Sequence, residues 1–154
     1  MILVREAEPA DAAQMSAVLT ASIRDLCTAD HRNDPTILAG WLRNKTPEMV
    51  LQMFDNPNAQ LFVAEHDGTI AAVGCVNGTD EIGLNYVDPA HRFSGVSKAL
   101  LAALEDHIRQ SGATRARLTS TGTARRFYLA SGWHDAGPGE DDRGMLCYPM
   151  EKSL

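Results

Sequence analysis

One segment joins a strand end, a Ser/Gly loop and a helix start, an arrangement that suits anion binding. The strand is expected to stop at Asp88-Pro89, and the helix start that follows offers free backbone N–H groups and the positive end of the helix dipole. The loop fits Arg-x-x-Gly-x-Ser, with Ser94 as candidate N-cap and Gly95 letting a ligand approach the backbone, and it matches neither a P-loop nor Gly-x-Gly-x-x-Gly. Its residues are Arg92, Phe93, Ser94, Gly95, Val96, Ser97 and Lys98.

The aromatic pair Phe127-Tyr128 on a short expected helix is the second candidate for chemistry. Successive helical residues point about 100° apart, so one of the pair is expected to pack in the core while the other points elsewhere. A tyrosine that lines a cleft can donate a proton to a leaving group. The alternative is that Tyr128 is an ordinary core residue of an amphipathic helix.

The charge distribution favours a small anionic ligand. The net charge of −6 argues against broad nucleic-acid binding. Residues 89–134 nevertheless hold seven Lys and Arg against two acids, a local charge of +5, and the other 108 residues carry −11. This basic island beside the loop fits a small polyanion, whereas exposed basic helix faces are the alternative explanation.

Length and composition predict one α/β domain over residues 1–154. No apolar run approaches the roughly 20 residues of a membrane span, and the N-terminus is expected to be a strand rather than a signal peptide. Cys27, Cys75 and Cys147 are odd in number and far apart, which argues against disulfides and favours a cytoplasmic location. The histidines show no ligand spacing with cysteines or acids, so no metal site is expected.

Periodicity and turn signals predict the elements that position these segments. A first strand precedes helical stretches that begin at Glu8, Pro35 and Pro47, the last with Thr46 as N-cap. A hairpin around Asp67-Gly68 joins strands at 61–65 and 70–76, and a strand at about 81–87 leads into the loop.

The second half of the chain is expected to alternate strands and helices. A helix over 94–110, a strand over 115–119, a helix over 123–130 and final strands near 133–137 and 143–150 follow in order. The main elements therefore read β-α-α-β-β-β-α-β-α-β-β, which predicts a mixed, mostly antiparallel α/β sheet.

The loop and the aromatic helix, about 30 residues apart, together resemble the GNAT acetyltransferase superfamily. In that family Arg/Gln-x-x-Gly-x-Gly/Ala follows the fourth strand and binds the acyl-CoA pyrophosphate, and Ala-x-x-Phe-Tyr-x-x-x-Gly-Phe supplies a tyrosine beside the CoA sulfur. The matching residues here are Arg92, Gly95, Ser97, Ala124, Phe127, Tyr128, Gly132 and Trp133. The resemblance covers the whole chain and implies a sheet splayed at the fourth and fifth strands. Ser97 departs from the usual Gly or Ala but is also small.

The resemblance implies an N-acetyltransferase in which an amine attacks the thioester of acetyl-CoA directly. Tyr128 would protonate the departing thiolate, and Glu81 would accept the amine proton through water. Strand alternation places Glu81, Gly83 and Asn85 on one face. For Glu81, a solvated acid after the Asn77-Gly78 turn is the alternative.

The resemblance also implies the cofactor contacts. The backbone N–H of Val87 would stabilise the oxyanion, and backbone groups of Tyr86 and Val87 would pair with the pantetheine arm. Backbone N–H groups from Phe93 to Lys98 would bind the pyrophosphate, and Arg92 would pair with phosphate. At the position of Thr121, many members carry an Asn that binds the cofactor arm. Here the Thr121 or Thr123 hydroxyl would make that contact instead.

The acceptor is expected to be a small-molecule amine or a peptide amine. His31 lies with Asp30 and Asp34 in a loop that shapes the acceptor pocket in this family. The acidity of this loop, with the charge of −11 outside residues 89–134, suggests a cationic amine acceptor, and a solvated polar loop is the favoured alternative. Trp41 could line that pocket or pack in the core. Family members are often dimeric, so a homodimer is a further expectation. Another acyl donor or acceptor, or a non-catalytic acyl-CoA-binding or regulatory module, are the alternatives, and the presence of both Tyr128 and Glu81 favours catalysis.

Overall fold

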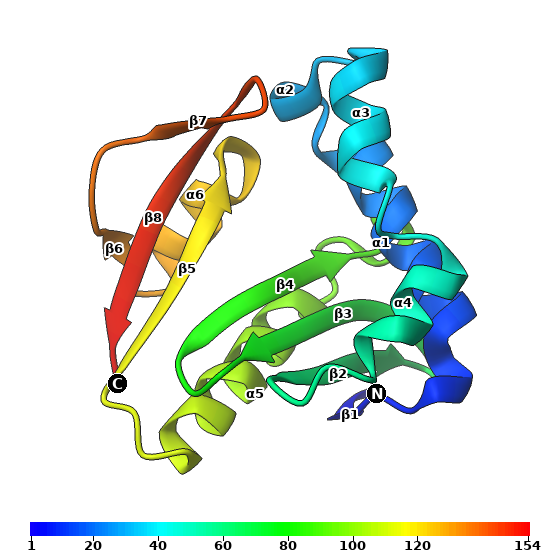
Figure 1. The fold of residues 1–154 in the computed structure, drawn as a ribbon. Coiled ribbons are helices and arrows are strands. Elements are labelled where there is room, and N and C mark those ends of the chain that lie inside the picture. The colour runs from blue at the N-terminus through cyan, green and yellow to red at the C-terminus, as the bar shows by residue number, and fades with distance from the viewer.

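The strands of this protein form one mixed sheet, which a computed structural model describes together with all other residues from Met1 to Leu154 (Figure 1). They are β1 (Ile2–Glu6), β2 (Ala59–His66), β3 (Thr69–Asn77), β4 (Glu81–Val87), β5 (Arg115–Thr121), β6 (His134–Asp135), β7 (Glu140–Asp142) and β8 (Met145–Ser153). Their order across the sheet is β1-β2-β3-β4-β5-β8-β6, with β7 paired to β8. Only β4 and β5 run parallel, so the expected mixed, mostly antiparallel sheet is confirmed.

Helices cover both faces of the sheet. They are α1 (Ala12–Leu26), α2 (Thr28–His31), α3 (Pro35–Leu42), α4 (Pro47–Met53), α5 (Val96–Gln110) and α6 (Gly122–Ala130), with single turns η1 (Pro9–Asp11) and η2 (Pro89–His91). The one unexpected helix is α2, a single turn in the segment expected to be a polar break. None of the helices has the length and apolar character needed to cross a membrane.

Two hydrophobic clusters lie on opposite faces of the strands. On one face Leu100 and Leu104 of α5 are fully buried in a cluster that also contains Tyr128 of α6. On the other face Met15 and Leu19 of α1 pack with residues of β2, β3 and α4. Because both of their faces are covered, β3 is buried almost throughout and β2 is buried along its middle, which explains the apolar runs in their sequences.

The helix starts confirm one expected N-cap and correct another. Thr46 caps α4, since its hydroxyl accepts a hydrogen bond from the Met49 N–H. Ser94 does not cap α5: its hydroxyl donates to the carbonyl of His91 at 2.6 Å. The helix begins instead after Gly95, whose φ of +90° a residue with a Cβ rarely adopts.

Three strands, rather than the expected two, close the chain. The tight turn lies at Arg143-Gly144, where both residues have positive φ and Asp142 pairs with Met145. This backbone is typical of a hairpin with a two-residue turn. The sequence Arg-Gly predicts such a turn less clearly than Asn-Gly or Asp-Gly does. Residues 137–139 form only the connection between β6 and β7.

A bulge in β4 overturns the expected alternation of its side chains. Cys75 pairs with Leu84 but Val76 pairs with Ile82, so Gly83 is an extra residue in the strand. Ile82 consequently lies in the α5 cluster, whereas Leu84 packs against the α1 cluster. Glu81 and Asn85 therefore point to opposite faces instead of sharing one.

β4 and β5 separate after a short contact, and this opens the sheet. Their register contains only two pairs, Glu81 with Arg117 and Ile82 with Leu118. Beyond these pairs both strands continue, to Val87 and to Thr121. The expected splay of the fourth and fifth strands is thereby confirmed.

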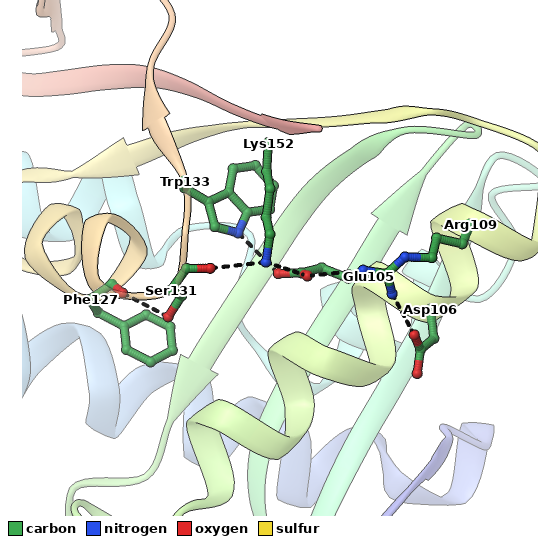
Figure 2. A network of polar contacts seen from close by, with 7 residues as sticks. All are labelled: Glu105, Asp106, Arg109, Phe127, Ser131, Trp133 and Lys152. Atoms are coloured by element: carbon green, nitrogen blue, oxygen red, sulfur yellow. Dashed lines mark hydrogen bonds and ion pairs between the residues drawn. The ribbon is translucent and has the colours of Figure 1, made fainter. Parts of the chain in front are cut away.

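A buried polar network fastens the second half of the sheet to α5 (Figure 2). The Glu105 carboxylate, whose side chain is 7% exposed, accepts from the Lys152 ammonium at 2.8 Å and from the Trp133 indole N–H at 3.1 Å. Lys152 also donates to the carbonyl of Ser131 at 2.9 Å. The network thus joins α5, the turn after α6, and β8.

We expect Glu105→Ala to lower the free energy of unfolding by about 2 kcal/mol or more, because it leaves the Lys152 ammonium and the Trp133 N–H without their acceptor. Urea unfolding measures the change. Asp106→Ala is the matched control, since its neighbouring carboxylate is exposed and pairs only with Arg109, and it is expected to cost less than about 0.5 kcal/mol. Equal losses in the two variants would contradict a structural role for the network.

Candidate active site

A cavity of about 430 Å³ lies where β4 and β5 separate. Its walls come from both strands, from the loop before α5, from α6 and from the end of α1. Polar and aromatic side chains that face this cavity include Asn85, Tyr86, Arg92, Phe93, Lys98, Thr121, Thr123, Phe127 and Tyr128. The cavity thus gathers both segments that the sequence indicated.

The loop before α5 presents backbone N–H groups to the cavity. α5 has no side-chain cap, so its first turn keeps N–H groups available. Gly95, Ser97 and Lys98 line the cavity, as do Arg92 and Phe93. The side chains of Ser94 and Val96 do not line it, because Ser94 bonds to the preceding turn and Val96 is buried in the core.

The basic island of the sequence does not form one basic surface at this cavity. Four of its bases are held in ion pairs with acids that do not line the cavity: Arg109, Arg115, Arg117 and Arg125. Only Arg92 and Lys98 line the cavity, and the Arg92 guanidinium lies 4.7 Å from the centre of the Phe93 ring. Two cations next to a helix start suit a phosphate group, but the local +5 overstates the charge there.

Tyr128 places its ring in the core and its hydroxyl at the cavity. The residue is 5% exposed and contacts Phe127 and Trp133 edge-on, with ring centres 5.4 and 5.7 Å away. Burial raises the pKa of Tyr128 to about 12, partly offset by the hydrogen bond that its oxygen accepts from the Asn85 amide at 3.0 Å. The phenol is therefore neutral near pH 7, and its own proton is left to donate into the cavity.

Glu81 lies away from this hydroxyl. Its carboxylate forms an ion pair with Arg117 at 2.9 Å and accepts from the Asn77 amide at 3.4 Å. Glu81 is not among the residues that line the cavity. The bulge at Gly83 explains this placement, since it turns Glu81 to the face opposite Asn85. The hypothesis that Glu81 is the base stays a prediction.

The threonine hydroxyls before α6 already have partners. Thr121 caps the helix by accepting from the Ala124 N–H at 3.2 Å. The Thr123 hydroxyl donates to Asp30, whose carboxylate also accepts from the Gly122 N–H at 2.8 Å. A ligand that bonds to the Thr121 hydroxyl would do so while that hydroxyl still caps α6. A ligand that bonds to the Thr123 hydroxyl would have to share it with Asp30.

A second cavity, of about 530 Å³, adjoins the first. Tyr86, Thr119 and Thr121 line both, and the rest of the second cavity lies between α3, the α3–α4 loop and the β7–β8 hairpin. Trp41 lines it and donates its indole N–H to the Tyr86 hydroxyl at 3.3 Å. Burial raises the pKa of Tyr86. Trp41 therefore faces a cavity instead of packing only in the core.

The acids of the 28–34 segment act as helix caps. Asp34 accepts from the Thr36 and Ile37 N–H groups of α3, as Asp30 does at α6. His31 is fully buried, with its Nε2 2.8 Å from the carbonyl of Ile23 and its Nδ1 accepting from the Asn33 N–H. The segment supplies no acid to the lining of the second cavity, whose own acid is Asp142. Arg32, Asn33 and Asp34 are exposed to solvent.

Sequence reasoning missed several residues of these cavities. Asn85, the partner of Tyr128, carries no motif, and the bulge that orients it has Gly83 as its only signal. Arg43, Lys45 and Arg143 line the second cavity without any spacing that would have indicated it. No group of His, Cys, Asp and Glu side chains that could hold a metal ion is present, and all three cysteines are free.

Comparisons with known proteins agree with this geometry. Residues 28–154 match the family described as "Acetyltransferase (GNAT) domain". Structurally, the chain is similar to a GCN5-related N-acetyltransferase from Rhodopseudomonas palustris, with a TM-score of 0.87, 22% identity, and 99% of this chain and 95% of that chain covered. No curated protein sequence matches the chain.

Two further solved structures share the fold. One is the PaiA N-acetyltransferase from Thermoplasma acidophilum in complex with coenzyme A, with a TM-score of 0.78 and 18% identity. The match covers 100% of this chain and 99% of that chain. The ribosomal-protein-S18-alanine N-acetyltransferase from Escherichia coli has a TM-score of 0.69 at 18% identity, covering 100% and 94%. These identities establish a common fold and no shared substrate.

We expect Asp30→Ala to lower the free energy of unfolding by about 1–2 kcal/mol, because the start of α6 loses its carboxylate partner. Urea unfolding measures the loss. Asp25→Ala removes an exposed acid that makes no hydrogen bond, and serves as the control with little expected change. Identical unfolding curves for the two variants would show that Asp30 does not support the helix that carries Tyr128.

Proposed function

The chain belongs to the GNAT acetyltransferase family, and we propose that it transfers the acetyl group of acetyl-CoA to an amine by direct attack of the amine nitrogen. The observation that carries the proposal is the position of the Tyr128 hydroxyl. It lines the cavity, accepts a hydrogen bond from Asn85 and donates none to the protein. That cavity also contains an uncapped helix start with two cations. An acyl-CoA substrate requires both features, an anion site for its phosphates and an acid for its departing thiolate.

The pyrophosphate of acetyl-CoA would bind at the start of α5. Backbone N–H groups from Phe93 to Lys98 would donate to it, and Arg92 and Lys98 would supply positive charge. Gly95 supports this assignment, because its left-handed conformation forms the turn that leaves the helix start uncovered. The small side chain of Ser97 keeps the approach open.

The pantetheine arm would lie along the open edge of β4. The Asp88 N–H donates to the carbonyl of Ala71 at 2.8 Å, which marks a hydrogen-bonded position of the β3–β4 ladder. Because N–H groups of an antiparallel strand alternate in direction, that of Val87 points away from β3, toward the side where β5 has separated. This orientation supports the roles proposed for Val87 as oxyanion donor and for the Tyr86–Val87 backbone in binding the arm.

The amine must lose a proton during the reaction. An amine with a pKa of ~10.4 is only about 0.04% neutral at pH 7, so a proton acceptor accelerates the attack. Glu81 lies outside the cavity and is paired with Arg117. We therefore assign the proton to water in the cavity, and its onward transfer through water to Glu81 is the alternative to be tested.

Replacing Tyr128 by Phe is expected to lower turnover more than tenfold with little change in acetyl-CoA affinity. The variant keeps the edge contacts with Phe127 and Trp133 but lacks the proton for the thiolate. Thiol release from acetyl-CoA measures turnover with a panel of polyamines, aminoglycosides, amino acids and peptides, and calorimetry measures binding.

Tyr148→Phe is the matched control, since Tyr148 packs under Arg125 and lines neither cavity. Unchanged turnover in the Tyr128 variant would remove it as the acid. Binding of acetyl-CoA by the wild type without thiol release for any amine would favour a non-catalytic binding module.

The rate is expected to rise with pH between about 7 and 10 and to show no alkaline decline in that range. The acid form of Tyr128 exists below its pKa, which burial raises to about 12, while the neutral fraction of the amine grows with pH. Initial rates measured across this range show whether the rate rises or falls with pH. A decline with a midpoint near pH 9 that disappears in Tyr128→Phe would show that the pKa of Tyr128 is not raised, whereas such a decline that persists in Tyr128→Phe would belong to another group.

Glu81→Gln separates the two routes for the amine proton in the same experiment. With water as acceptor, its pH–rate profile should superimpose on that of the wild type. A loss at low pH that recovers as the amine deprotonates would instead identify Glu81 as the base.

A further inference from the structure

The charged residues that line the second cavity are mostly cations. They are Arg43, Lys45 and Arg143, against one acid, Asp142. None of the three cations forms an ion pair with a carboxylate of the protein. Arg43 and Arg143 are exposed and Lys45 is buried. A surplus of cations without acidic partners in a cavity is expected where an anion is to be bound.

Lys45 is the buried one of these three cations. The residue is 6% exposed, and its ammonium has a single neutral partner, the side-chain oxygen of Asn44. Its backbone is fixed in the α3–α4 loop, because its carbonyl accepts from the buried Ser16 hydroxyl at 2.6 Å. Burial lowers the pKa of Lys45, and no carboxylate opposes this effect. A buried ammonium with two unused donors is costly unless a ligand completes its contacts.

The passage to the first cavity lies at Thr121, which lines both cavities and pairs with Cys147 of β8. Cys147 also lines the second cavity. The one acid of that cavity, Asp142, lies next to Arg143 in the β7–β8 turn, whereas Lys45 belongs to the α3–α4 loop.

We infer that the acceptor is a small amine that also carries an anionic group, a carboxylate or a phosphate. Its anionic group lies at Lys45 with Arg43 and Arg143, and its amine extends toward Tyr128 past Thr121, which lines both cavities. This inference rests on the proposed acetyl transfer and specifies its second substrate. It replaces the purely cationic acceptor that the acidic 28–34 segment suggested, because those acids serve as caps.

Matched acceptor pairs test the inference. Each pair differs only in the anionic group: an amino acid against its amide, and phosphoethanolamine against ethanolamine. We expect the anionic member of at least one pair to have a kcat/KM about tenfold or more higher, since a charged hydrogen bond contributes about 1.5–3 kcal/mol. The amino-acid pair identifies a carboxylate acceptor and the phosphoethanolamine pair identifies a phosphate acceptor.

Lys45→Met is the decisive variant. It keeps the length of the side chain and removes an unpaired buried charge, so the fold is expected to remain at least as stable. The preference for the anionic member should fall about tenfold. Arg24→Met, which removes an exposed cation outside both cavities, is the control and should leave the preference intact.

Binding provides a second readout. Trp41 lines the cavity, so titration of the anionic acceptor should change tryptophan fluorescence in the wild type and require about tenfold more ligand in Lys45→Met. Faster acetylation of polyamines than of any anionic amine, or a preference that survives in Lys45→Met, would overturn the inference while leaving acetyl transfer in place. Acetylation of no amine at all would instead overturn the proposed function.

Discussion

The separation of β4 from β5 is the constraint on which the rest of the structure depends. Two register pairs join these parallel strands before they diverge. The divergence leaves a strand edge without a neighbour, and a buried strand edge needs hydrogen-bond partners. In this protein that edge faces the first cavity, where an extended amide-containing ligand can supply the partners.

A split sheet needs other interactions to hold its two halves at a fixed distance. α5 packs beneath β2, β3 and β4, and the Glu105 network ties it to β8 and to the turn after α6. Trp133 belongs to this network and contacts the ring of Tyr128. The same buried carboxylate that fastens the halves therefore also helps to position the phenol, so stability and the geometry of the site are coupled.

The second cavity depends on segments that are distant in sequence. The α3–α4 loop supplies Lys45, and the β7–β8 hairpin supplies Asp142 and Arg143. The hairpin is held against the helical side by the hydrogen bond from Arg32 to the carbonyl of Gly144 at 3.2 Å. Acceptor binding is thus proposed to rely on loops, while acetyl-CoA binding relies on the sheet and α5, which agrees with the usual division between variable loops and a rigid scaffold.

The sequence by itself determined the loop before α5, the helix of Tyr128 and the order of the main elements apart from α2 and the division of the last strands. These features depend on local periodicity, turn residues and short motifs. It failed where one inserted residue changed a side chain's direction: Gly83 turned Glu81 away from the face of Asn85. Only the tertiary structure decided which charges are free. Arg115, Arg117 and Asp30 are engaged by partners far along the chain, whereas Lys45 is buried without one. The pairing of charges depends on distances in space, and local patterns in a sequence carry no information on them.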